Sequence, residues 1–223
     1  MDELREQWEK IRLLMEYAVP DERLREARDL LDEYRDDRIA LDLLHEFYSY
    51  LPEARDDWAR DIRLVGRSRG VFLLALVTGH SGYLYLVSSE GIEFHGRLAD
   101  GYVNRKVLDF FNLPGPEEFR QICAEPGSFP SYEPLGMDRD VCPACHAVTG
   151  EVHEFGCPVE VCPWCGGQLI HCNCRFDRLE VDELVSEEDL DRFLKLVEEK
   201  GRIPYAPEQR PTFADEGPGV VIE

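Results

Sequence analysis

The 223-residue chain is strongly acidic, since 46 Asp and Glu against 25 Lys and Arg give a net charge of −21. This length allows one ordinary hydrophobic core plus a small satellite that depends on something other than buried apolar area. The charge repels a phosphate backbone, so nucleic-acid binding is disfavoured, and the acidic excess itself favours solubility. No run approaches the roughly 18 apolar residues of a membrane span, so a cytoplasmic protein without membrane association is predicted.

Helices are predicted over the first 60 residues. Apolar residues recur at alternating steps of four and three, which indicates one amphipathic helix over residues 4–20. Two further helices are predicted at 21–34 and 37–51, and a proline in the first turn opens a short fourth helix over 52–58.

The pattern changes near Ile62 to that of a small sheet. Three short runs rich in β-branched and aromatic residues are separated by glycine-containing turns: 71–77, 83–88 and 92–95. An antiparallel meander over about residues 62–96 is predicted, followed by helices over about 104–124. Helices packed against a small sheet make residues 1–128 an α+β domain.

The rest of the chain divides into four predicted segments. They are a Pro-, Gly- and Ser-rich linker at 129–140, a two-zinc module at 141–175, a C-terminal helical segment at 176–205 and a flexible acidic tail at 206–223. Within the helical segment, Ser186 followed by Asp189 is typical of a helix start, and Gly201 of a helix end.

The cysteines indicate metal binding rather than disulfides, because seven of the eight fall within 33 residues. With one histidine they form four pairs: Cys142 and Cys145, His153 and Cys157, Cys162 and Cys165, and Cys172 and Cys174. Two cysteines separated by two residues can reach one ion across a tight turn. Eight donors complete the tetrahedral coordination of two zinc ions and leave no position for water. The sequence therefore predicts two structural zinc ions per chain and no catalytic metal.

Several details of this ligand set remain open. Sequential pairing places the first four donors on one ion and the last four on the other, whereas a cross-braced arrangement combines the first pair with the third. His146 or His171 can replace His153, although His153 has the better spacing to Cys157. The remaining cysteine, Cys123, lies well before the cluster and is interpreted as a buried apolar residue.

Other cofactors are compatible with parts of the same cysteine-rich sequence. CPACH at Cys142 matches c-type haem attachment, CPWC at Cys162 matches a redox motif, and thiolate-rich ligation also suits an iron–sulfur cluster. Haem or redox chemistry leaves the other cysteines without a role. The segment has few large apolar side chains to offset a backbone ordering cost of about 1–2 kcal/mol per residue, whereas zinc can supply on the order of 10 kcal/mol per site.

Four sequence motifs in this part of the chain have a specific spacing: CPAC, GEVHEFGC, VEVCPWCGGQLIHCNC and, further on, KGRIPY. They resemble a group of small uncharacterised bacterial zinc-ribbon-like proteins whose shared text reads CPxC, GxxHxxGC, ExCPxCGGQ and CxC. The resemblance covers residues 141–205. It implies zinc ligation by the same eight residues, outer-sphere or packing roles for Glu160 and Gln168, and a bacterial or phage origin. It implies no activity, and it leaves residues 1–128 without a family.

Candidate catalytic residues outside the cysteines are sparse. His80 and His95 lie near predicted sheet turns, where histidines are common, and a pocket joining them would favour an enzyme. The acidic pairs Asp36–Asp37 and Asp56–Asp57 are interpreted as solvated surface, because adjacent helical side chains do not face each other. The sequence contains no phosphate-binding glycine loop, nucleophile elbow or HExxH motif.

Three classes of function follow. The first is a non-enzymatic protein whose zinc module presents a rigid surface to an unidentified protein partner. The second is nucleic-acid contact through the zinc module, against which stands the absence of Lys and Arg between Cys142 and Cys174. The third is an enzyme with its site in the first domain. The sequence favours the first.

Overall fold

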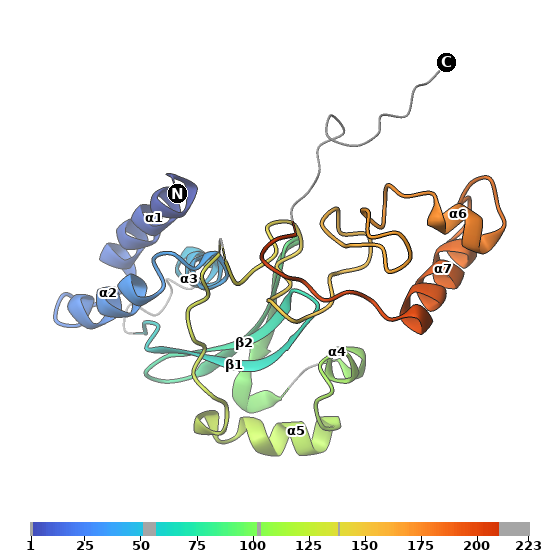
Figure 1. Cartoon of the computed structure of the whole chain (residues 1–223). Coiled ribbons are helices and arrows are strands. Elements are labelled where there is room, and N and C mark those ends of the chain that lie inside the picture. Colours follow the sequence, from blue (N-terminus) through green and yellow to red (C-terminus); the bar gives the residue numbers. More distant parts are fainter. Residues whose placement is uncertain (1, 51–56, 102–103, 138, 210–223) are drawn as a thin grey trace. The chain divides into compact units, whose positions relative to one another are not determined.

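The computed structural model describes residues 2–50, 57–101, 104–137 and 139–209 (Figure 1). The chain forms two compact units, Met1–Met137 and Asp138–Glu223. Helices and a four-stranded antiparallel sheet make the described part an α+β structure, as predicted. No helix of the described residues is long and apolar enough to cross a membrane.

Three helices open the first unit: α1 (Asp2–Ala18), α2 (Leu24–Glu33) and α3 (Arg38–Tyr50). Their apolar stripes are buried, so the helices predicted from periodicity are confirmed. Most of the predicted fourth helix, over residues 52–58, lies outside the described residues, and Asp57 and Trp58 are not helical.

The sheet is an antiparallel meander of four strands in chain order. The strands are β1 (Asp61–Ser68), β2 (Val71–Val77), β3 (Gly82–Ser88) and β4 (Gly91–Arg97). The three predicted runs correspond to β2, β3 and β4. The sequence does not reveal β1, because a bulge between Leu64 and Gly66 interrupts the alternation of inward and outward side chains.

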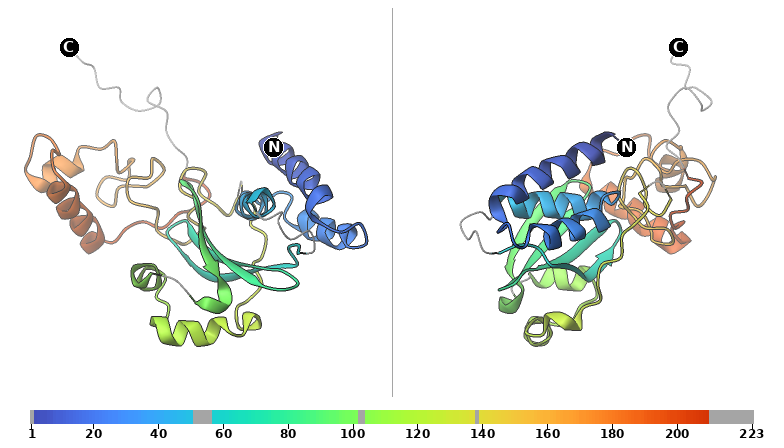
Figure 2. Two further views of the ribbon diagram at one scale, coloured as in Figure 1. Left: turned by 180° about the vertical axis from the view of Figure 1, so that it is seen from behind. Right: turned by 90° about the vertical axis from the view of Figure 1, so that its left-hand side faces the viewer.

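Helices cover both faces of this sheet. Residues 72–76 of β2 are all fully buried, which requires packing on each side of the strand. Helices α1, α2 and α3 lie over one face, and α4 (Arg105–Phe110) and α5 (Pro116–Cys123) lie over the other (Figures 1 and 2). Two short 3-10 helices, η1 (Leu98–Asp100) and η2 (Pro126–Ser128), flank them. Cys123, the last residue of α5, packs into the hydrophobic core, as predicted.

Residues 129–137, at the start of the predicted linker, are part of the first unit. Ser131 forms an antiparallel bridge with Arg63 on the outer edge of β1. The carbonyl of Pro130 accepts a hydrogen bond from β1 at 2.9 Å, and the amide of Tyr132 donates one to β1 at 2.8 Å. This segment therefore covers one edge of the sheet and is not a free connection.

Asp37 is buried, which makes the prediction of a solvated carboxylate wrong for this residue. Its side chain is 1% exposed. The carboxylate accepts hydrogen bonds from the Tyr132 hydroxyl at 2.9 Å, the Leu135 amide at 2.8 Å and the Ala40 amide at 3.0 Å. Asp37 therefore caps the start of α3 and also ties the 132–135 segment to that helix.

Replacing Asp37 with alanine is expected to destabilise the first unit by about 3 kcal/mol, because it leaves buried donors without an acceptor. Asp36→Ala, at the exposed neighbouring position, is the matched control and is expected to cost less than about 0.5 kcal/mol. Urea-induced unfolding, monitored through hydrogen exchange of the amides in the sheet, measures the stability of both variants. Equal stability of the two variants would contradict the bracing role of Asp37.

The second unit contains α6 (Cys174–Leu179) and α7 (Glu187–Lys200). The Ser186 side chain accepts a hydrogen bond from the Asp189 amide at 3.2 Å, and Gly201 follows the last residue of α7, as predicted. The predicted helical segment begins at residue 176, whereas α6 begins two residues earlier, at the candidate metal ligand Cys174.

Candidate metal centres

The structure gathers the eight candidate ligands into two sets in sequential order. Site one consists of Cys142, Cys145, His153 and Cys157, and site two of Cys162, Cys165, Cys172 and Cys174. Within each set the ligand atoms all lie within 4.8 Å of one another. Each set can hold one metal ion in a four-coordinate shell. This grouping is the sequential one and not the cross-braced one.

A 20-residue repeat builds the first half of each site. In both copies, the amide of the first cysteine donates a hydrogen bond to the carbonyl five residues later. The carbonyl of that cysteine in turn accepts a hydrogen bond from the amide of a later residue. Short antiparallel bridges close both turns, Val141 with Val148 and Val161 with Gln168. The hydrogen bonds Thr149 N to Asp140 O and Leu169 N to Glu160 O, both 2.8 Å, complete the correspondence. Each turn brings two thiols to one point.

One position in each turn has left-handed backbone geometry. Gly166 takes it with φ of 75°, and His146 takes the corresponding place with φ of 62°. This conformation is favourable for glycine and uncommon for other residues. His146 belongs to neither ligand set, and the Nδ1 of His171 instead contacts Gln168 Oε1 at 2.6 Å. The structure therefore selects His153 from the three candidate histidines.

Site one is closed to solvent, since its four side chains are 0–5% exposed. Hydrogen bonds donated by Cys145 and Cys157 lower the pKa of Cys142 well below its usual value, and the contact with Cys142 raises the pKa of Cys157. A single thiolate is thus stabilised by its neighbours, whereas several thiolates this close repel one another. A divalent cation removes that repulsion, so the donor set fits a metal ion.

A buried ion pair supports site one from outside the ligand set. Arg202 Nε and Nη2 donate to the two carboxylate oxygens of Glu160 at 2.7 and 2.9 Å, and the two side chains are 4% and 1% exposed. Arg202 Nη2 also donates to the carbonyl of the ligand His153 at 2.6 Å. The guanidinium therefore fixes the backbone that carries a ligand.

The segment after α7 packs against site one. Tyr205 is 1% exposed and contacts the buried cysteines of this site. Its ring lies edge-to-face with the His153 ring, and the two ring centroids are 5.5 Å apart. Its amide donates to Glu151 O at 2.8 Å, and its carbonyl accepts from Gly150 N at 2.9 Å. Residues 206–209, predicted as the start of a flexible tail, form a turn, and the rest of that tail lies outside the described residues.

Site two is more open than site one. Cys162 is buried, but Cys165 is exposed and the last two ligands are half-buried. The backbone N–H of Gly167 lowers the pKa of Cys165, which favours the thiolate that a metal requires. Cys162 packs with α6 and α7 in one core that includes Leu179, Phe193 and Val197. Site two and the C-terminal helices therefore form one packed structure.

A chelator is expected to take the metal from site two before site one, because it reaches the exposed ligands first. Native mass spectrometry after addition of excess chelator follows the loss of each ion, and alkylation with peptide mapping identifies the freed cysteines. Labelling of Cys165 and Cys174 is expected to precede that of Cys142 and Cys157. The reverse order would contradict this difference between the sites.

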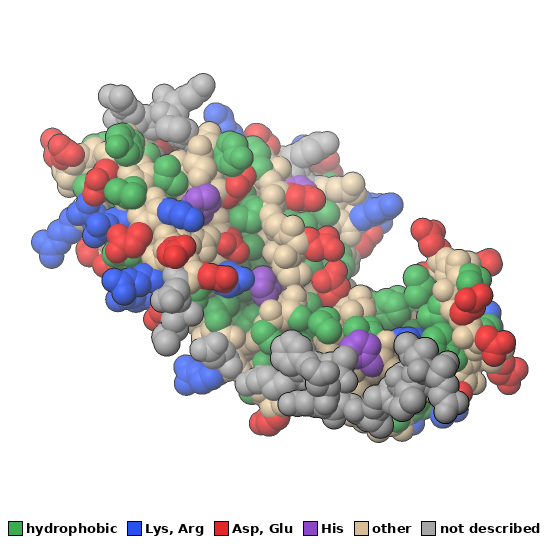
Figure 3. Space-filling model, turned by 90° about the horizontal axis from the view of Figure 1, so that it is seen from above, with side chains coloured by type: hydrophobic (Ala, Val, Ile, Leu, Met, Phe, Trp, Pro, Cys, Tyr) green, Lys and Arg blue, Asp and Glu red, His purple; other side chains and the backbone are tan. Residues whose placement is uncertain are grey.

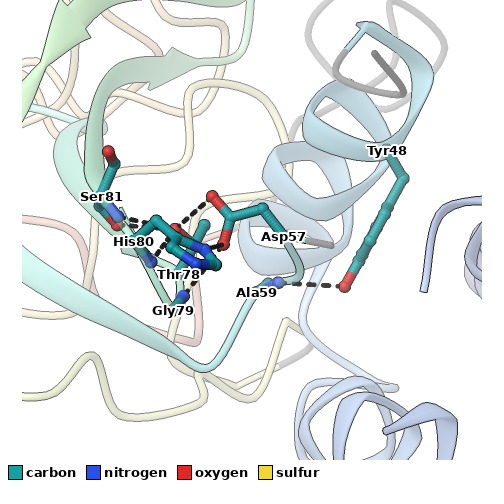
Figure 4. Close-up of polar contacts among 7 residues, drawn as sticks. All are labelled: Tyr48, Asp57, Ala59, Thr78, Gly79, His80 and Ser81. Atoms are coloured by element: carbon teal, nitrogen blue, oxygen red, sulfur yellow. Dashed lines mark hydrogen bonds and ion pairs between the residues drawn. The ribbon is translucent and has the colours of Figure 1, made fainter. Parts of the chain in front are cut away.

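The candidate histidines of the first unit have separate partners. At the turn between β2 and β3, the Asp57 carboxylate accepts from Thr78 Oγ1 at 2.7 Å and Gly79 N at 3.0 Å and lies 3.4 Å from His80 Nδ1 (Figure 4). Asp57 is 14% exposed, so the prediction of a solvated carboxylate is wrong for it, and it braces the turn. His95 instead lies 3.5 Å from a carboxylate oxygen of Glu93.

Comparisons with protein-family models, curated proteins and solved structures give no significant match to this chain. The second unit provides two four-donor metal sites, one enclosed and one partly exposed.

Proposed function

We propose that this chain is a non-enzymatic zinc protein in which two structural zinc ions hold the second unit folded, so that it can present a surface to a protein partner. The observation that carries the proposal is the assembly of two complete four-donor sets, one of them entirely buried. Sets of three cysteines with one histidine, and of four cysteines, are typical of structural zinc. A catalytic zinc keeps one position for water, which four protein donors fill.

The resemblance to bacterial zinc-ribbon-like proteins supports the same proposal. Its matching text includes Glu160, Arg202 and Tyr205, which all support site one. We therefore propose a relationship to that group, with a bacterial or phage origin. A reducing cytoplasm suits the proposal, because it keeps cysteines available for metal.

A candidate interaction surface lies where α6 leads into α7. Residues 180–191 contain seven acidic and no basic side chains. Within them, Val185 is 75% exposed and Leu190 is 45% exposed. Apolar side chains among carboxylates suit a protein partner that carries basic and apolar groups.

On the face in Figure 3, Lys and Arg side chains are scattered among acidic ones, which does not favour binding of a nucleic-acid backbone.

Affinity capture from cells of the source organism tests the interaction. The double variant Val185→Ser and Leu190→Ser is expected to lose a partner that the wild-type chain retains. The control variant Leu13→Ser and Tyr17→Ser removes apolar groups that are 53% and 80% exposed on α1, and it is expected to retain that partner. Loss of the partner in the control alone, or in neither variant, would contradict the proposed surface.

A further inference from the structure

Gln209 lies 56 residues after His153 in the chain, yet it contacts the ring of this ligand. His153 Nδ1 is 3.4 Å from Cys145 Sγ, so Nδ1 faces the other donors of site one. The opposite ring nitrogen, Nε2, is 3.0 Å from Gln209 Oε1. The imidazole therefore spans the space between the donor set and the glutamine.

The orientation of the Gln209 amide follows from its second contact. Its Nε2 donates to the carbonyl of Pro204 at 3.1 Å, which turns Oε1 toward the imidazole. A histidine that binds a metal through Nδ1 must be neutral and must carry its proton on Nε2. Gln209 Oε1 is an acceptor for that proton, so it favours the tautomer that ligation needs.

The same contact connects the metal site to the segment that follows α7. Arg202 donates to the carbonyl of His153, Tyr205 packs edge-to-face with its ring, and Gln209 Oε1 contacts its Nε2. An ion that fixes the imidazole thus also fixes the groups on which this segment rests. Conversely, the contact with Gln209 orients the ring of the ligand His153 toward the other donors.

We propose that Gln209 is a positioning residue for the metal ligand His153, and that occupancy of site one holds residues 202–209 against the module. The inference rests on the proposed zinc binding and concerns site one alone. Outer partners of metal-bound histidines typically contribute about 10- to 100-fold to metal affinity, so loss of Gln209 is expected to weaken zinc at site one by that factor.

The test uses the full-length chain and zinc as the probe. Competition with a graded chelator, read by native mass spectrometry, gives the affinity of each zinc equivalent, and alkylation mapping assigns it to a site. In Gln209→Ala, site one is expected to weaken about 10- to 100-fold while site two is unchanged. The amide of Tyr205 is expected to exchange faster with solvent. Gln209→Glu, which keeps an acceptor oxygen but loses the donor to Pro204, is expected to weaken site one less than Gln209→Ala.

Gln168→Ala is the matched control, because this glutamine contacts His171, which is outside both ligand sets. It is expected to leave site one unchanged. Unchanged affinity of site one in Gln209→Ala, or equal weakening of both sites, overturns the assignment of Gln209. A wild-type chain that holds no zinc at site one overturns the proposed function, and this inference with it.

Discussion

Removal of both metal ions is expected to unfold residues 139–209 while the first unit keeps its structure. The second unit has little apolar core apart from its cysteines and the groups packed on them. Ordering its backbone costs about 1–2 kcal/mol per residue, and structural zinc supplies on the order of 10 kcal/mol per site. The first unit has its own core on both faces of the sheet and does not depend on these ions. Hydrogen exchange before and after chelation measures both units in one sample.

Single substitutions separate the two sites. Cys162→Ser is expected to release one metal equivalent and to raise exchange in α6 and α7, because Cys162 packs directly in their core. Cys123→Ala, which removes the cysteine outside the ligand sets, is expected to keep both equivalents. Loss of protection in strands β1–β4 of Cys162→Ser would contradict the independence of the units.

Arg202→Met is expected to destabilise the second unit by about 3–5 kcal/mol, the second large effect. It leaves the Glu160 carboxylate, 1% exposed, without its cationic partner. It also removes the hydrogen bond to the His153 carbonyl. Urea unfolding of the zinc-loaded protein, followed through Trp164 in a variant that lacks the other tryptophans, measures the change.

Two controls identify the cause of that loss. Combining Arg202→Met with Glu160→Leu is expected to recover most of the stability, because no buried charge is left unpaired. Arg192→Met removes an arginine that is 60% exposed and pairs with Asp189 at 3.5 Å, and is expected to cost less than about 1 kcal/mol. A double variant less stable than Arg202→Met would show that packing, and not the unpaired charge, dominates.

The sequence predicts the ligand sets well because the chemistry is local. Paired thiols need tight turns, and such turns leave a fixed spacing with glycine nearby, as at Cys162, Cys165 and Gly166. Helix periodicity and the capping serine are equally local, so α1, α3 and α7 follow from neighbouring residues.

Long-range contacts are the part that spacing does not reveal. Arg202 reaches Glu160 across 42 residues, and Gln209 reaches His153 across 56. Asp37 is an ordinary helix-start carboxylate in the sequence, and only the return of the chain at Tyr132 buries it. The motif KGRIPY offers a signal for Arg202 and Tyr205, although their role at site one becomes visible only in the fold.

Elemental analysis combined with native mass spectrometry, on protein purified without added metal or chelator, tests the central claim most directly. Two four-donor sites predict two zinc ions per chain, one in each set. Iron in place of zinc, or fewer than two ions per chain, would contradict the account of two structural zinc sites.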